Sequence, residues 1–236
     1  MVTLRKHRIS RLEEFSDAVF GFALTLLVIT ANVPRSYTEL IQLLEGIPAF
    51  ACCFALLVWI WYEHDAFYER YPLEDGRTIL LNSALLFTVL LYIYPLKFMF
   101  DSFMYEVFRL QTNSDLKRMS LDELSRASVL YGLGFFILMA LFALMYLHAH
   151  RSRTELELTE LQAFDARLLA GNHAVSAGVG LFAMVFALVA PRELAFLSPS
   201  SFALMGPGHW LYGTWSDKQR KAFAERLAAT PPARVS

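Results

Sequence analysis

The sequence predicts an all-α, polytopic membrane protein with six transmembrane helices, and two observations support this fold class. The first is composition: 56% of the 236 residues are hydrophobic, 20 are Phe, and the mean hydropathy is +0.41, which is unusual for a soluble domain. The second is that six windows contain few charges and approach the roughly 17–25 apolar residues that cross about 30 Å of hydrocarbon. A membrane-spanning helical bundle therefore fits the sequence better than a soluble domain.

The first two spans are bounded by charge and by proline. Residues 15–33 follow a short basic stretch and end before Pro34. Residues 47–62 form the second span, which ends at the charged cluster 63–65. His64 lies just beyond the apolar run, so we expect its ring to turn inward to a polar partner.

The third and fourth spans flank a polar stretch at residues 111–126. The third, residues 79–100, contains Pro95 and a lysine, so we expect it to leave the bilayer near Tyr94. The fourth, residues 127–147, is uninterrupted and predicts a complete crossing.

The last two spans differ in regularity. Residues 168–190 are rich in Gly, Ala and Ser and end before Pro191, and small residues allow close approach of helices in lipid. Residues 194–212 form the weakest span because they contain Pro199 and Pro207, so we expect this span to be kinked or partly re-entrant.

The distribution of Lys and Arg predicts the orientation. With both termini on one side of the membrane, that side holds 14 of the 21 basic residues. The positive-inside rule then places both termini in the cytoplasm of a multi-pass cell-membrane protein. Of the seven basic residues on the other side, however, five lie within residues 97–126. The expected organisation is a cytoplasmic N-terminus (1–14), a six-helix domain (15–213) and a cytoplasmic C-terminal tail (214–236).

The sequence contains no motif typical of an enzyme: no glycine-rich nucleotide loop, no zinc-protease helix and no nucleophile elbow. His148, His150 and Glu155 could bind a metal, but their spacing fits one helical face poorly, and a basic interfacial loop is the better interpretation. Adjacent Cys52 and Cys53 fit core residues rather than a disulfide framework. We expect no enzymatic activity, cofactor, bound metal or nucleic-acid partner.

One apolar stripe follows the first span. At about 100° per residue from Phe22, the side chains of Leu26 and Ile29 lie at about +40° and −20°, and Thr25 lies at about −60°, at the edge of the stripe. The Thr25 hydroxyl could serve as a polar ligand in the pore, or it could donate a hydrogen bond to the backbone carbonyl one turn earlier.

Two polar residues of the first span point away from this stripe. On the same scale Ser16 and Asp17 lie at about +120° and −140°. A charge facing lipid costs at least about 2.5–3.5 kcal/mol, so Asp17 should face protein and find a hydrogen-bond donor. Ser16 and Asp17 could instead only cap the helix. The candidate donors are Trp59, Trp61, His64, Asn82 and Arg11.

The start of the first span resembles a known family. Arg11, Phe15, Ser16 and Asp17, followed by Ala-Val-Phe, are similar to the R-x-x-x-F-S-D signature of the endolysosomal potassium channel family, transmembrane protein 175, and its prokaryotic relatives. A Trp-rich second span ending in His64 agrees with this resemblance, which is sharp over residues 11–100 and only topological beyond them.

The resemblance implies a homotetramer of six-helix subunits with a potassium-permeable pore lined by the first helix. It implies potassium over sodium selectivity, and that Arg11, Phe15, Ser16 and Asp17 are structural. Trp59, His64 and Asn82 are candidate partners for this motif in the neighbouring spans. It also implies that the stripe of Phe22, Leu26 and Ile29 forms the hydrophobic constriction. Family members commonly have a branched aliphatic residue where this chain has Phe22.

Two other classes of function compete with a channel. A secondary transporter would usually show inverted repeats, and none is evident in this sequence. A non-conducting membrane scaffold would explain the spans but would need no apolar stripe on the first helix. Flux of potassium across liposome membranes discriminates between a channel and a scaffold.

Overall fold

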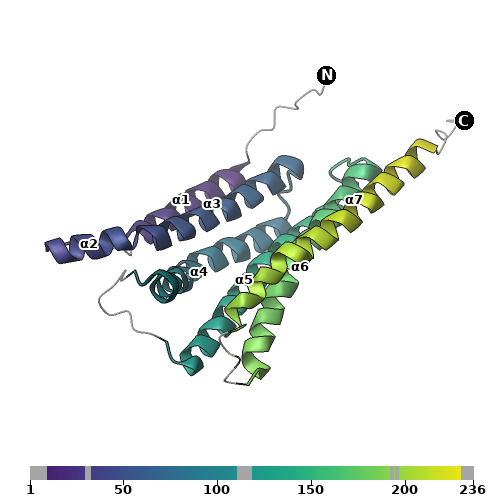
Figure 1. Ribbon diagram of the computed structural model, residues 1–236. Helices are drawn as coiled ribbons and strands as arrows, with labels where there is room; N and C mark the ends of the chain where they lie inside the picture. The colour runs from purple at the N-terminus through teal and green to yellow at the C-terminus, as the bar shows by residue number, and fades with distance from the viewer. Residues whose placement is uncertain (1–9, 30–32, 111–118, 192–193, 195–196, 230–236) are drawn as a thin grey trace, which may run out of the picture.

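The computed structural model describes residues 10–29, 33–110, 119–191, 194 and 197–229, and the elements of these residues are all helical (Figure 1). The termini at 1–9 and 230–236, and the ends of the first and sixth predicted spans at 30–32 and 195–196, lie outside the described residues. The helices are α1 Arg11–Ile29, α2 Tyr37–Glu45, α3 Ile47–Arg70, α4 Gly76–Phe108, α5 Leu121–Arg151, α6 Glu160–Val189, the 3-10 helix η2 Pro199–Leu204 and α7 Met205–Ala229.

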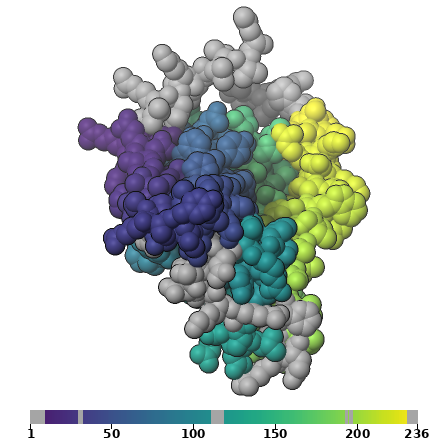
Figure 2. All heavy atoms as spheres, turned by 60° about the vertical axis from the view of Figure 1, so that its left-hand side comes forward, coloured from purple at the N-terminus to yellow at the C-terminus, as the bar shows by residue number. Residues whose placement is uncertain are grey.

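The long helices form one elongated bundle. The start of α1, the α3–α4 and α5–α6 connections and the end of α7 lie at the same end of it (Figure 1). α1 packs on α3 and α4, α4 packs on α5, and α6 packs between α5 and α7. The space-filling view shows α1 and α7 on opposite sides of the subunit (Figure 2).

Polar side chains define the helix starts. Ser10 and Glu13 form a capping box at α1: the Glu13 backbone N–H donates to Ser10 Oγ at 3.2 Å, and the Ser10 backbone N–H donates to the Glu13 carboxylate at 2.6 Å. Ser120 and Thr159 begin α5 and α6 with the same motif. The cap of α1 is therefore Ser10, and Ser16 and Asp17 lie in the second turn.

α4 corrects the expectation for the third span, because it continues through Pro95 to Phe108. Proline removes one backbone donor, but neighbouring packing can hold such a helix together. Leu96 is buried, and Lys97 forms an ion pair with Asp101 at 2.6 Å one turn later. The helix is thus not interrupted near Tyr94.

Small residues bring α5 and α6 into close contact, as the composition of the fifth span predicts. A Cβ atom on Gly180 would lie 2.9 Å from the Phe136 backbone nitrogen, and one on Gly132 would lie 2.8 Å from the Gly180 carbonyl oxygen. Only glycine fits at such distances, so these two residues determine where the two helices cross.

The sixth predicted span divides into two elements. Pro199 begins η2, and Pro207 lies in the first turn of α7, which then extends past the predicted end at residue 212 and past the predicted tail boundary at 214. Among the described residues, four helices are long and apolar enough to cross a membrane: α3, α4, α5 and α6. α1 and α7 are not among them, and the short α2 occupies a stretch where no element was predicted.

Candidate pore helix and its anchoring network

α1 has one buried and one exposed face. Ser16, Phe20, Ala23 and Leu27 are each at most 3% exposed and pack against α3 and α4. On the opposite face Phe15, Phe22 and Ile29 are 58%, 55% and 67% exposed. A single subunit therefore leaves a column of large apolar side chains uncovered along α1.

The exposed face is rotated slightly from the stripe that the sequence predicts. Thr25 is exposed near the middle of this face, whereas Leu26 is half-buried at its edge and packs against the core. The Thr25 hydroxyl donates to the Gly21 carbonyl at 2.9 Å, so it takes the back-bonding alternative in this conformation.

A buried hydrogen-bond chain connects α1, α4 and α3. Asn82 Nδ2 donates to Ser16 Oγ at 2.9 Å, and the Ser16 hydroxyl donates to the Leu12 carbonyl at 2.8 Å. His64 Nε2 lies 2.8 Å from Asn82 Oδ1. Since the amide oxygen only accepts, Nε2 must carry the proton. His64 is thus turned inward to a polar partner.

Asp17 forms a separate contact with α3. Trp61 Nε1 donates to Asp17 Oδ1 at 2.8 Å, and both residues lie toward the surface of the subunit. The predicted partner Trp59 does not reach this motif; its side chain bonds to Glu63, four residues later on α3. Trp61 therefore takes the position expected for Trp59.

The other two residues of the motif, Arg11 and Phe15, lie on the surface of α1. Arg11 is exposed in the first turn of α1, and Phe15 lies on the uncovered apolar face. Phe20, which the sequence reasoning missed, packs edge-on against the His64 ring at a centroid distance of 5.4 Å. Its position one turn after Ser16 on the same face was the signal available in the sequence.

The remaining candidates do not gather into a site. His148 lies beside Asp75, and His150 faces the Ala163 carbonyl. Within the described ranges no group of three His, Cys, Asp or Glu side chains could hold a metal ion. Cys53 is buried and Cys52 is half-buried, and both are free thiols.

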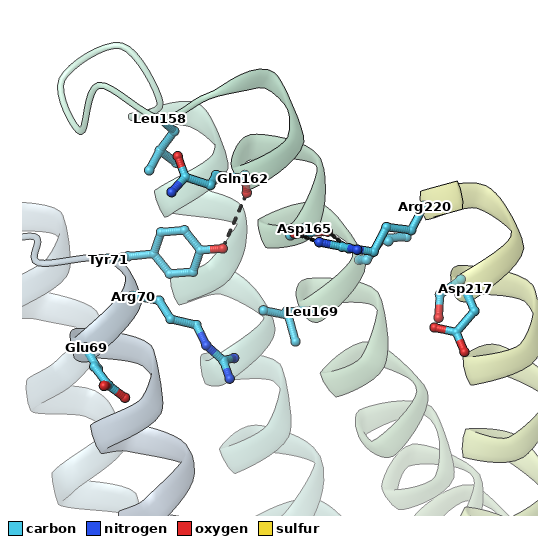
Figure 3. Close-up of a pocket in the computed structure, with 11 residues that line it drawn as sticks. Glu69, Arg70, Tyr71, Leu158, Gln162, Asp165, Leu169, Asp217 and Arg220 are labelled. Atoms are coloured by element: carbon cyan, nitrogen blue, oxygen red, sulfur yellow. Dashed lines mark hydrogen bonds and ion pairs between the residues drawn. The ribbon is translucent and has the colours of Figure 1, made fainter. Parts of the chain in front are cut away.

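One open cavity of about 510 Å³ lies far from α1, between the end of α3 and helices α6 and α7 (Figure 3). Arg220 pairs there with Asp165 through two hydrogen bonds of 2.7 and 3.0 Å. The Tyr71 hydroxyl donates to the Gln162 carbonyl at 3.4 Å. These contacts tie α3, α6 and α7 together at this end of the bundle.

Comparisons with known proteins agree with this arrangement. The model of the family described as endosomal/lysosomal potassium channel TMEM175 matches residues 11–92, which run from the start of α1 into α4. A protein named potassium channel from Marivirga tractuosa is 37% identical over 187 residues, which cover 77% of this chain and 76% of that protein.

Two solved structures are similar in fold. The crystal structure of the potassium channel MtTMEM175, as a T38A variant bound to a nanobody–MBP fusion, has a TM-score of 0.81 and 33% identity, covering 92% of this chain and 97% of that chain. A lysosomal potassium-selective channel TMEM175 homologue from Chamaesiphon minutus has a TM-score of 0.54 and 20% identity, covering 86% and 96%, and supports the fold alone.

Proposed function

The chain belongs to the endosomal/lysosomal potassium channel TMEM175 family and is a potassium channel, and we propose that four copies assemble with their α1 helices around one pore. The observation that carries this proposal is the exposed apolar face of α1. One such stripe cannot enclose a path, so several copies must surround an axis, and a closed ring of four is the simplest arrangement.

Phe22, Leu26 and Ile29 form the constriction of this pore. The stretch of α1 that carries them, from Ala18 to Ile29, contains no charged residue, so an ion that passes must keep its water or lose most of it at a cost. A ring of apolar side chains around the pore is a barrier because water leaves it. Potassium holds its water less tightly than sodium does, so potassium ions cross this barrier more readily than sodium ions. The preference for potassium over sodium is accordingly modest.

Thr25 is the polar group nearest to this ring. It lies on the exposed face between Phe22 and Ile29, and its hydroxyl oxygen keeps a free lone pair while the proton points to Gly21. Four such oxygens could replace part of the water that a potassium ion sheds.

Arg11, Phe15, Ser16 and Asp17 have a structural role rather than a conducting one, and Ser16 and Asp17 are the two that bond α1 to its neighbours. The buried Ser16–Asn82 bond and the Trp61–Asp17 bond support this role, because they connect α1 to two neighbouring helices. A helix that lines a pore must keep its rotation fixed, since a turn of about 100° would replace one set of lining residues by the next.

The topology that accompanies this function has six spans in the cell membrane: α1, α3, α4, α5, α6 and a last span over residues 194–212, which includes η2 and the first turns of α7. The basic residues at the bundle end that holds the α3–α4 and α5–α6 connections support cytoplasmic termini. α1 contributes a span although it carries Asp17, because Trp61 satisfies that carboxylate.

Purified protein in lipid vesicles tests the proposal. A potassium gradient should drive flux that follows the membrane potential without a coupled counter-ion, and mass measurement of the particle should give four chains. A secondary transporter would instead need a coupling ion, and a scaffold would show no flux. A particle that stays monomeric would overturn the pore built from α1.

A further inference from the structure

The open cavity between α3, α6 and α7 lies at the end of the bundle that holds the α3–α4 connection (Figure 3). α6 forms its back wall, with Arg70 of α3 on one side and Asp217 of α7 on the other. The residues that line this volume of about 510 Å³ include none from α1 and none of its hydrogen-bond partners. The proposed pore therefore does not use this cavity.

The rim of the cavity carries charges of both signs. Its charged side chains are three carboxylates and two guanidinium groups, those of Glu69, Asp165, Asp217, Arg70 and Arg220. Arg220 and Asp165 neutralise each other through their two hydrogen bonds. Within the described part of the chain, Glu69 and Asp217 form no ion pair, and Asp217 acts on Arg220 only through space. The rim as a whole therefore keeps one net negative charge.

Arg70 is the cation of the rim that is not engaged in an ion pair among the described residues. Its guanidinium lies beside the Tyr146 hydroxyl and is exposed on the α3 side of the cavity. The planar fork of an arginine matches the oxygens of a phosphate group. The rim thus offers a phosphate donor at Arg70 and carboxylate acceptors for a cation at Glu69 and Asp217.

Exposed aromatic side chains lie below both sides of the rim. Tyr62 and Trp210 precede Glu69 and Asp217 by seven residues each, which places each ring on the same helix face as its carboxylate. They are 58% and 68% exposed. α3 and α7 both run toward this end of the bundle, so both rings lie roughly 10 Å deeper than the charges. Such rings are typical of the membrane interface, so the cavity faces the headgroup region of the bilayer.

We propose that this cavity binds the headgroup of a phospholipid that carries a primary ammonium group, of the phosphatidylethanolamine class. The phosphate accepts hydrogen bonds from Arg70, and the ammonium donates to Glu69 and Asp217. The acyl chains continue along the surface that carries Tyr62 and Trp210. A charged rim above exposed aromatic rings thus matches a polar headgroup above its chains.

The chemistry of the rim separates this lipid from two others. The quaternary ammonium of phosphatidylcholine has no N–H to donate to the carboxylates. Phosphatidylglycerol brings a net negative charge to a rim that is already negative, and like charges are repelled. The site therefore discriminates by headgroup rather than by acyl chain.

Binding to the purified full chain in detergent tests this proposal. Phosphatidylethanolamine, phosphatidylcholine and phosphatidylglycerol with identical acyl chains would be added in turn. Native mass spectrometry would measure the bound lipid, and the thermal unfolding midpoint would report the stabilisation that binding to the folded state produces. The wild type should bind phosphatidylethanolamine about tenfold more tightly than the other two, because it alone gains the charge-assisted bonds to the carboxylates.

Variants on the two sides of the cavity locate the site. Asp217→Asn removes one ammonium acceptor at an exposed position, and Arg70→Gln removes the phosphate donor; each should reduce the affinity for phosphatidylethanolamine about tenfold. Glu225→Gln and Arg77→Gln are the matched controls, because both residues are exposed near this end of the bundle but do not line the cavity. Both controls should bind as the wild type does.

Equal binding of the three lipids by the wild type, or an unchanged preference in Asp217→Asn, would overturn the proposal. A further arm adds water-soluble glycerophosphoethanolamine at the same concentration as the lipid. Failure of this compound to displace the lipid supports a membrane source, whereas full displacement would assign the cavity to a soluble zwitterion instead. These measurements record no ion flux, so their outcome is independent of the proposed function.

Discussion

Asp17 shows how a carboxylate is accommodated in an apolar helix. Its hydrogen bond from Trp61 gives the charge a partner on α3, and the Ser16–Asn82 bond one residue earlier gives α1 a partner on α4. The bonds leave neighbouring positions of one helix in different directions. Together they resist rotation of α1 about its own axis.

Trp61→Phe should therefore weaken the subunit without changing ion preference. The variant keeps the aromatic ring but leaves Asp17 without this donor, and losing a hydrogen bond to a charged group costs about 1.5–3 kcal/mol. Chemical unfolding of the purified protein would measure the loss. In combination with Asp17→Asn the two losses should not add, because both changes act on one contact.

A shift in the potassium-to-sodium permeability ratio in Trp61→Phe or Asp17→Asn, with unfolding unchanged, would contradict this structural role. Asp17 would then be a pore charge rather than an anchor for α1.

Phe22→Ala should raise potassium flux and reduce discrimination against sodium. Removing the aromatic ring of Phe22 widens the constriction and lets water fill it. Each decrease of about 1.4 kcal/mol in the barrier raises the rate roughly tenfold. Val19→Ala is the control, because Val19 is half-buried against the core and lies about 60° away from Phe22 around α1. Vesicle flux with potassium and with sodium measures both effects; equal changes in the two variants would exclude Phe22 from the ring.

The sequence predicts which residues form the site better than it predicts which residues they contact. Helical spacing is enough to put Ser16 and Asp17 off the stripe, and the position of His64 just beyond the apolar run predicts that its ring turns inward. It cannot choose between Trp59 and Trp61, which point about 160° apart, because the rotation of α3 against α1 depends on packing along the whole helix. The sequence also does not give the rotation of α1 in the bundle, so it does not predict that Leu26 lies at the edge of the exposed face.

At the scale of elements, the α5–α6 crossing depends on two glycines. The backbones approach so closely at Gly132 and Gly180 that a side chain at either position would meet main-chain atoms. α7 packs on α6, so this crossing fixes the surface against which α7 packs.

Gly180→Leu should disrupt this crossing, whereas Gly178→Leu should be tolerated. Overpacking a close contact costs typically about 1–3 kcal/mol, and here the obstacle is backbone that cannot move aside. A Cβ atom on Gly178 would meet nothing within 4 Å, so the control adds the same side chain on the same helix without a clash. Thermal unfolding midpoints compare the two variants, and equal midpoints would show that the close approach does not stabilise the fold.

Element boundaries show where sequence patterns fail. Proline predicts an interruption at position 95, yet α4 continues, because burial of the surrounding residues outweighs one missing backbone bond. In contrast, Pro199 does coincide with a change from the preceding stretch to the short η2. Pro95 lies between the large side chains of Tyr94 and Leu96, whereas Pro199 lies between Ser198 and Ser200, and serine favours turns and helix ends.

At the scale of the whole molecule, the subunit is incomplete as a channel. Its largest exposed apolar side chains on α1 face away from the other helices of the same subunit. The sequence predicts this stripe from its periodicity, but the number of subunits around it is a property of an interface that one chain does not contain.

Cysteine accessibility along α1 tests the central claim that this helix lines the conduction path. In a background of Cys52→Ala and Cys53→Ala, single cysteines would be probed with a water-soluble thiol reagent while potassium flux is recorded. The account predicts that the reagent blocks flux at the stripe positions and not at buried positions of the same helix. The stripe set is Phe22→Cys, Leu26→Cys and Ile29→Cys, and the buried set is Ala23→Cys and Leu27→Cys. Protection of the stripe set together with reaction at the buried set would contradict it.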